Sequence, residues 1–155
     1  MFQLDKSWTS NYKSAMKTGL IIHLIGKIRD RANQFLLKEL AEHKIMGIAP
    51  SHGDIMGALY LHGELPMKKI AEMIGRDKST VTTLINKLIQ LGYVEKKTDP
   101  DDSRVNIISL TDMGRMMEQD FWDISQALRE KAYHGLSAEE KETLMQLLTK
   151  IHGNM

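Results

Sequence analysis

Apolar residues recur at every third or fourth position along most of the chain, a spacing that predicts amphipathic helices. The first and longest of these segments runs from Tyr12 to Lys44. A helix of this length exceeds what a small domain needs for its own core, so its surplus apolar face predicts contact with a helix of a second subunit. The apolar stripe consists of Leu20, Ile21, Leu24, Ile25, Ile28, Phe35, Leu36 and Leu40.

Three shorter helices are expected next, and their ends are marked by proline, glycine and aspartate. Proline suits the first turn of a helix, glycine suits the position after its last turn, and an aspartate side chain caps the first N–H groups. The predicted segments are Ser51 to Leu61 after Pro50, Met67 to Ile74 between Pro66 and Gly75, and Lys78 to Leu91 after Asp77.

The last two of these segments have the order and the lengths of a helix-turn-helix. In this motif the first helix crosses the second at a small residue, and Ala71 occupies that position. Gly75 supplies the turn between the helices. The shared core is expected to contain Ile70, Ile74, Val81 and Leu84.

After Gly92 the pattern takes on strand character. Two strands are expected at 93–97 and 105–110, joined by a polar turn at 99–102, which together make a hairpin with a charged tip. A fifth helix is expected from a Thr111 cap to about Tyr133. A last helix opens at a capping box formed by Ser137 and Glu140.

Polar residues cover the solvent face of the second helix of the helix-turn-helix. Hydroxyl, amide and ammonium groups suit phosphates and the base edges of the major groove, so this face predicts DNA binding. The residues on or near it are Lys78, Ser79, Thr80, Thr82, Thr83, Asn86 and Lys87. The hairpin adds Lys96, Lys97 and Arg104 for the flanking backbone or minor groove.

Charge supports this interpretation only locally. The whole chain has 21 Lys and Arg against 20 Asp and Glu, a balance that is no evidence for nucleic-acid binding. Between Pro66 and Arg104 there are eight basic and six acidic residues, and three of the acids lie in the hairpin tip. A few well-placed cations suffice for phosphate contacts, so the helical part carries the clearer positive bias.

In their order and spacing these motifs resemble the MarR family of bacterial regulators over nearly the full chain. The matching segments are Ser79-Thr80-Val81-Thr82, Leu91-Gly92-Tyr93-Val94, Asp102-Ser103-Arg104, Leu110-Thr111-Asp112-Met113-Gly114 and Gly135-Leu136-Ser137-Ala138-Glu139-Glu140. The resemblance implies a mainly α fold with a small β-hairpin wing, a winged helix-turn-helix with N- and C-terminal dimerisation helices. It implies one domain over residues 1–155, with about 50–110 binding DNA and about 1–48 and 111–155 forming the homodimer.

The function implied by the resemblance is sequence-specific binding of double-stranded DNA at a near-palindromic operator. The protein would be a homodimeric repressor that a small-molecule effector releases, and Arg104 would enter the minor groove, oriented by Asp102. The sequence departs from many relatives in having Thr83 in place of Arg and Asn86 in place of Asp. No operator sequence can therefore be transferred. Ala49 also replaces the hydroxyl residue usual before Pro50.

Several other classes of protein are disfavoured. Cysteine is absent, no run of about 18 apolar residues could span a membrane, and residues 1–6 lack the order of a secretory signal. We therefore expect a cytoplasmic protein without a cofactor, and the absence of a nucleophile–base constellation argues against an enzyme. Two alternatives remain open: a winged-helix protein-interaction module, and a metal-responsive regulator in which His43 and His52 meet across a turn.

Overall fold

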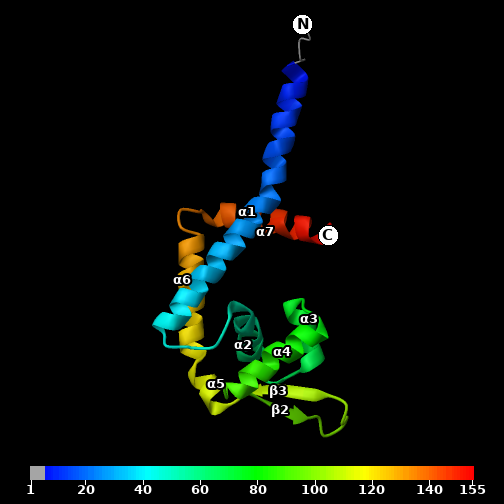
Figure 1. Ribbon diagram of the computed structural model, residues 1–155, viewed down its shortest axis with the longest axis vertical. Helices are drawn as coiled ribbons and strands as arrows, with labels where there is room; N and C mark the ends of the chain where they lie inside the picture. Colours follow the sequence, from blue (N-terminus) through cyan, green and yellow to red (C-terminus); the bar gives the residue numbers. More distant parts are fainter. Residues whose placement is uncertain (1–5) are drawn as a thin grey trace.

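The structure, a computed structural model, describes residues 6–155, with side chains from residue 19 onward. Residues 1–5, which belong to the segment used to argue against a secretory signal, lie outside the described residues. The elements in chain order are α1 (Lys6–Glu42), α2 (Pro50–His62), β1 (Leu65–Pro66), α3 (Met67–Ile74), α4 (Lys78–Gln90), β2 (Val94–Thr98), β3 (Asn106–Leu110), α5 (Asp112–Met116), α6 (Glu118–Ala132) and α7 (Ala138–Gly153) (Figure 1).

The core lies where α2, α3 and α4 pack together over the small sheet. The C-terminal half of α1 lies beside α6 above this unit, and both helices contribute to the core through Leu40 and Ile124 (Figure 1). Fully buried aliphatic side chains of this kind stabilise a fold by roughly 1.5–3 kcal/mol each. Those with no more than 1% exposure are Ile55, Met56, Leu59, Ile70, Val81, Ile85, Leu88 and Ile108.

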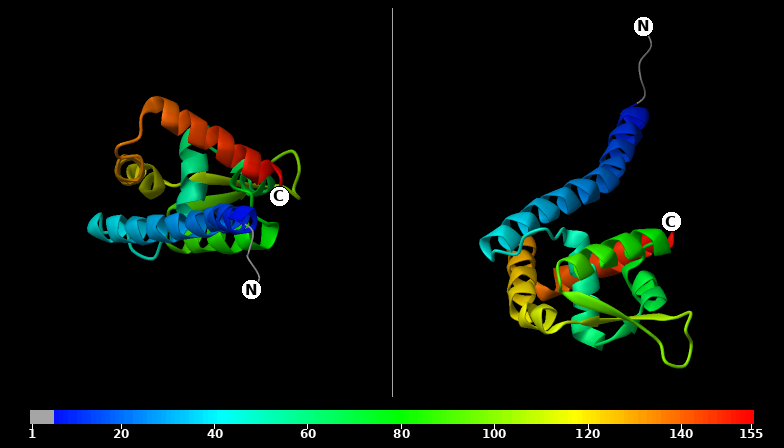
Figure 2. Two further views of the ribbon diagram at one scale, coloured as in Figure 1. Left: turned by 90° about the horizontal axis from the view of Figure 1, so that it is seen from above. Right: turned by 60° about the horizontal axis from the view of Figure 1, so that its bottom comes forward.

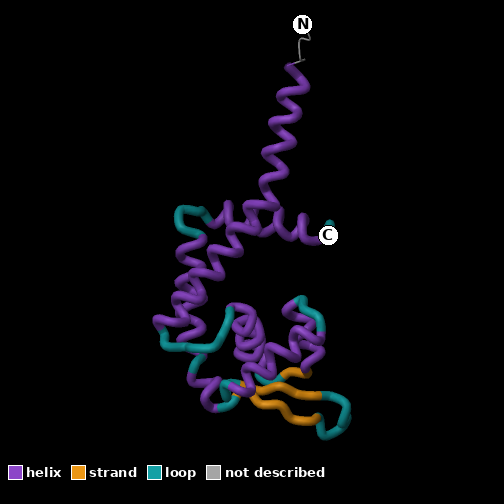
Figure 3. Tube along the Cα trace, viewed as in Figure 1, coloured by secondary structure: helices purple, strands orange, loops and turns teal. Residues whose placement is uncertain are grey.

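The wing is a three-stranded antiparallel sheet in the order β1-β3-β2 (Figure 3). The hairpin of β2 and β3 agrees with the prediction, and β1 adds a third strand that the sequence did not indicate. Leu65 pairs with Ile108 and Pro66 with Ile107. Two residues are too short for an alternating pattern, and a proline, which lacks an N–H, belongs at the edge of a sheet.

The single helix expected from Thr111 to about Tyr133 is divided into α5 and α6 at Met117. The apolar stripe continues through the break without a proline, which is why the sequence pattern did not reveal it. The break follows a close approach at Gly114, where a Cβ atom would overlap the carbonyl oxygen of Tyr93. Thr111 fixes the same junction, because its hydroxyl donates to the Gly92 carbonyl (2.5 Å) and accepts the Gly114 N–H (3.1 Å).

The other predicted boundaries agree with the structure to within two residues, except that α1 begins at Lys6 rather than Tyr12. None of the helices in residues 6–155 combines the length and apolar character that a membrane span requires.

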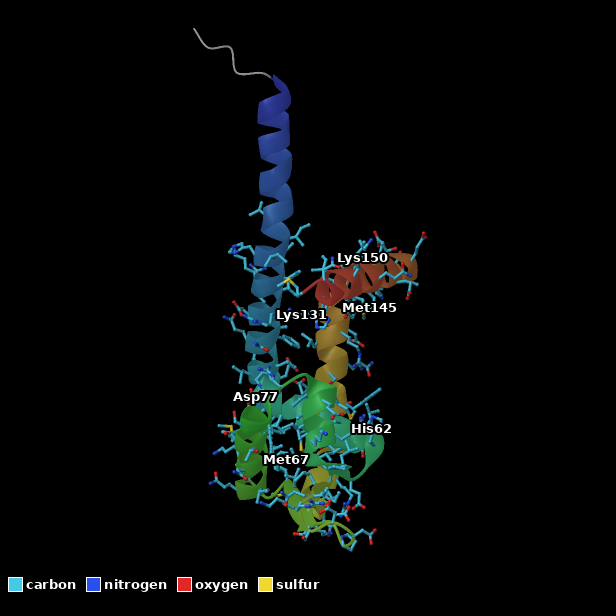
Figure 4. All side chains as sticks on the ribbon, turned by 90° about the vertical axis from the view of Figure 1, so that its right-hand side faces the viewer. His62, Met67, Asp77, Lys131, Met145 and Lys150 are labelled. Carbon is cyan, nitrogen blue, oxygen red and sulfur yellow. The ribbon has the colours of Figure 1, made fainter. Side chains whose placement is uncertain are left out.

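Two helices leave large apolar surfaces uncovered. The N-terminal half of α1 extends beyond the rest of the chain. α7 has no buried residue; seen from above, it starts well apart from α1 and runs at an angle toward it (Figure 2). Figure 4 shows Met145 and Lys150 on α7, well away from the unit that carries Met67 and Asp77. The large exposed apolar residues are Leu20, Ile21, Ile22, Leu24, Ile28 and Leu37 on α1 and Leu144, Met145, Leu147 and Leu148 on α7.

Candidate nucleic-acid interface

A tight turn at Gly75 sets the angle between α3 and α4. Gly75 adopts the left-handed conformation (φ 63°, ψ 38°), which costs glycine no steric strain. The N–H of Arg76 then donates to the Ala71 carbonyl (3.1 Å), closing the C-terminus of α3. Ala71 is half-buried against the core, as the helix-turn-helix pattern predicted.

The N-terminus of α4 is organised by the carboxylate of Asp77. This carboxylate accepts the N–H of Thr80 (2.9 Å) and the hydroxyls of Ser79 (2.5 Å) and Thr80 (2.6 Å). The hydroxyl of Ser79, followed by the two bonds from Thr80, holds the pKa of Asp77 far below its usual range. The cap therefore stays ionised and fixes both side chains that follow it.

Two further hydroxyls of α4 bond to the helix itself. Thr82 Oγ1 donates to the carbonyl of Lys78 (2.7 Å), and Thr83 Oγ1 donates to the carbonyl of Ser79 (3.1 Å). Such bonds to the preceding turn are common for threonine in helices.

The structure places all seven predicted residues of α4 at or near the surface. Thr80 and Thr82 are half-buried. Residues three and four apart share a helix face, so the exposed side chains form a continuous strip of hydroxyl, amide and ammonium groups. The exposed residues are Lys78, Ser79, Thr83, Asn86 and Lys87.

The wing tip is built by its acidic residues. Asp99 Oδ1 accepts the N–H groups of Asp101 (2.8 Å) and Asp102 (3.2 Å), which shapes the turn between β2 and β3. Asp102 in turn holds the Arg104 guanidinium at two points, 3.0 Å from Nε and 3.2 Å from Nη2. The Arg104 side chain remains 88% exposed on a loop that projects beyond the helices (Figures 1 and 2).

These hydrogen bonds lower the pKa of Asp102, with the Arg104 side chain as the main cause and its backbone N–H as the next. The acids that dilute the charge of the wing thus serve to shape the tip and orient its arginine.

The two lysines of β2 point in different directions. Lys96 pairs with Ile108 and Lys97 with Ile107, and successive residues of a strand face opposite sides of the sheet. Lys97 also forms an ion pair with Glu95 (2.7 Å). The hydrogen bond with Lys97 lowers the pKa of Glu95 and raises that of Lys97. Lys96 and Lys97 are both exposed, one on each face of the wing.

A cavity of about 670 Å³ lies between α2 and the α5–α6 segment, and sequence reasoning did not find it. Two arginines face it. Arg115 donates to the carbonyl of Leu110 at the end of β3 (2.7 Å) and to Asp112 (2.7 Å), and Arg129 lies 5.2 Å over the ring of Trp122. Trp122 and Met116, two large apolar residues of the predicted fifth helix, are signals in the sequence, but neither locates a cavity. The lining also includes Tyr60, Leu61, Met116, Glu118 and Phe121.

The histidines considered as metal ligands have other partners. His43 Nδ1 lies 2.8 Å from Asp120, joining the end of α1 to α6. His52 Nδ1 accepts the N–H of Ala49 (3.0 Å) and so caps α2, where the sequence offered no hydroxyl. Within the part of the chain that the structure describes, no three His, Asp or Glu side chains cluster as a metal site would require.

Comparison with known proteins identifies the family. Residues 46–105 match the sequence model of the MarR family. YwhA, an HTH-type transcriptional regulator of Bacillus subtilis, is 30% identical over 99 residues, which are 64% of this chain and 71% of YwhA. The chain belongs to the MarR family. Its relatives are transcriptional regulators rather than enzymes, in agreement with the sequence expectation.

Other MarR-family proteins match over more of the chain. The multiple antibiotic resistance protein MarR of Escherichia coli is 24% identical over 147 residues, covering 94% of this chain and 98% of MarR. A mutant of that protein in complex with operator DNA has the same fold, with a TM-score of 0.74, 22% identity and coverage of 83% and 91%. BpsR of Bordetella bronchiseptica, whose DNA binding is regulated by 6-hydroxynicotinic acid, gives a TM-score of 0.73 at 20% identity, with coverage of 85% and 98%.

Membership in the family makes this chain a transcriptional regulator with a winged helix-turn-helix. The family and the fold that the motifs predicted are therefore confirmed.

Proposed function

We propose that this regulator is a homodimeric repressor that binds a near-palindromic site on double-stranded DNA. The observation that carries the proposal is the wing tip, where Asp102 holds an almost fully exposed arginine on a projecting loop. A narrow minor groove concentrates negative potential, so one oriented arginine there contributes more than a mobile surface lysine. The exposed strip on α4 supplies the major-groove contacts, from Lys78, Ser79, Thr83, Asn86 and Lys87, with Thr80 and Thr82 beside them.

The uncovered apolar faces of α1 and α7 support the homodimer. Leu24 is 56% exposed and Leu147 is also 56% exposed, and each lies in a row of large apolar neighbours. Contiguous apolar surface of this kind marks an interaction site. In this proposal about 1–48 and 111–155 join the subunits, about 50–110 bind DNA, and two-fold symmetry sets the half-sites about 10 base pairs apart.

The cavity beside α6 supports release by a small-molecule effector. It lies between the wing junction and the helix that packs on α1, and it combines aromatic walls with Arg115 and Arg129. A ligand can shift DNA affinity only if it binds one arrangement of the two winged units more tightly than the other. A group that draws Arg115 away from the Leu110 carbonyl would act directly on the end of β3.

The test is selection of genomic DNA fragments by the purified protein, with Arg104→Ala and Lys38→Ala in parallel. Lys38 is a matched control, because it is also an exposed cation paired with an acid, Glu42 (3.4 Å), but lies on α1. We expect wild type and Lys38→Ala to recover the same near-palindrome, and Arg104→Ala to recover it about tenfold less well, the effect of roughly 1.4 kcal/mol. If Arg104→Ala recovers the site as well as wild type does, the wing arginine does not contribute to DNA binding.

If wild-type protein enriches no sequence, the proposal of a sequence-specific repressor fails. DNA retention that does not fall steeply with added salt would also contradict it, because phosphate contacts release counterions.

A further inference from the structure

The hydroxyl groups of α4 have a fixed direction of hydrogen bonding. A hydroxyl has one proton to donate and two lone pairs that accept. Ser79 and Thr80 lie against the Asp77 carboxylate, whereas Thr82 and Thr83 lie against backbone carbonyls. A carboxylate and a carbonyl can only accept, so each of these four hydroxyls is the donor in its bond.

What these hydroxyls offer to DNA is therefore lone pairs alone. Phosphate oxygens, guanine O6 and N7, and thymine O4 are acceptors, and none of them can bond to a hydroxyl whose proton is already donated. The groups in the major groove that donate are the amino groups of adenine (N6) and cytosine (N4). The hydroxyls of α4 thus match two of the four bases and do not match the backbone.

We propose that Ser79 and Thr83 read adenine or cytosine amino groups as hydrogen-bond acceptors and set the base preference at two positions of each half-site. This inference rests on the proposed binding of α4 in the major groove. Ser79 and Thr83 are the two exposed members of the set, whereas Thr80 and Thr82 are half-buried. They lie four residues apart, about one helical turn or 5.4 Å, which spans one to two base-pair steps of roughly 3.4 Å.

The internal bonds resist exchange for a phosphate contact, most strongly at Ser79. Its bond to Asp77 is short (2.5 Å) and charge-assisted, and such bonds are roughly twice as strong as neutral ones. A phosphate that displaced it would also approach the ionised carboxylate of Asp77, which repels it. Phosphate contacts are left to the donors of the strip, Lys78 and Lys87, while the Asn86 amide can both donate and accept.

The experiment is selection from randomised duplexes with wild type, Thr83→Val and Thr83→Ser. Valine keeps the branched shape and removes the oxygen, and serine keeps the oxygen. We expect wild type to enrich adenine or cytosine at one symmetric pair of positions by about fivefold, a typical gain for one base contact. Thr83→Val should abolish that enrichment and Thr83→Ser should restore it, with the salt dependence of affinity the same in all three.

Modified DNA isolates the amino group. Replacing the selected adenine by purine, which lacks the 6-amino group, should weaken binding of wild type about fivefold and leave Thr83→Val unchanged. Ser79→Ala is expected to remove a base preference at a second position. This second variant tests the inference independently if circular dichroism shows that Thr83→Val is poorly folded.

Three results would overturn the inference. A preference for guanine or thymine that disappears in Thr83→Val would mean that the hydroxyl donates. Weaker binding of Thr83→Val to all sequences alike, with base preferences unchanged, would mean that the hydroxyl contacts a phosphate. Unchanged base preferences in both Thr83→Val and Ser79→Ala would mean that neither residue reads DNA. Failure of wild type to enrich any sequence is a different outcome, since it refutes the proposed repressor as well.

Discussion

Substitution of Gly114 by alanine tests the junction between the wing and α6. A Cβ at this position would overlap the carbonyl oxygen of Tyr93 and lie 3.0 Å from its carbonyl carbon and 3.3 Å from Cδ2 of Leu110. That oxygen also accepts the N–H of Thr111 (3.1 Å). Because backbone rather than a flexible side chain stands in the way, α5 can accommodate the methyl group only by moving off the start of β2.

The expected loss of stability combines three effects. Overpacking a filled site costs about 1–3 kcal/mol, and losing the bond between Thr111 and Tyr93 adds about 0.5–1.5 kcal/mol. Alanine offsets about 0.5–1 kcal/mol of this, because it favours a helix more than glycine does. The free energy of unfolding should therefore fall by roughly 2–3 kcal/mol, and the melting temperature by about 4–12 °C for a chain of this size.

Urea unfolding followed by far-UV circular dichroism measures this loss. Protein concentration must be held constant, because the stability of the proposed dimer depends on it. Gly57→Ala is the matched control: Gly57 also lies in a helix, α2, but a Cβ there meets nothing within 4 Å. The control should gain about 0.5–1 kcal/mol. If Gly114→Ala is as stable as wild type, or gains as much as Gly57→Ala, the contact with Tyr93 does not hold α5 in place.

Two further predictions concern helix caps. Burial, followed by the nearby charge of Lys87, lowers the pKa of His52 below its usual 6.5. As pH falls below 6.5, the unfolded chain therefore takes up a proton on this histidine before the folded chain does. The free energy of unfolding decreases over this range, down to the lower pKa of the folded state. In urea titrations between about pH 7 and 5, His52→Gln, which can still accept the Ala49 N–H, should show a shallower loss than wild type; equal slopes would contradict this. Ser137→Ala removes the cap of α7, where Ser137 Oγ accepts the Glu140 N–H (3.1 Å), and should cost about 1 kcal/mol. Sedimentation equilibrium should show a weaker dimer, and an unchanged dissociation constant would place α7 outside the proposed subunit interface.

The helix-turn-helix could be predicted because its signals are local. The N-cap Asp77 and the left-handed Gly75 mark chain positions where the backbone must turn, and α3 spans the predicted Met67–Ile74. The buried faces of α2 and α4 also follow from the 3.6-residue period.

Two of the features that escaped prediction depend on contacts between distant residues. β1 exists only because Leu65 meets Ile108. The break at Met117 depends on the close approach of Gly114 to Tyr93. The His52 cap is local, since its partner Ala49 is three residues away, but histidine is not among the residues that usually mark a helix cap. The direction of the α4 hydroxyl bonds is also local, but the sequence shows only that hydroxyls are present and not which groups receive their protons. The roles of the individual DNA-binding residues stay predictions until the selections described above are made.

The positions of the two uncovered helices have a consequence for how the protein is made. The core is supplied by residues from Leu40 to Ile124, a nearly contiguous stretch, whereas the exposed apolar rows lie toward the two ends of the chain, on α1 and α7. A ribosome therefore synthesises every residue of the buried core before it begins α7. In the proposed homodimer, pairing through both helices has to wait for the end of translation, so a chain terminated before α7 would carry the winged unit without a complete dimer surface.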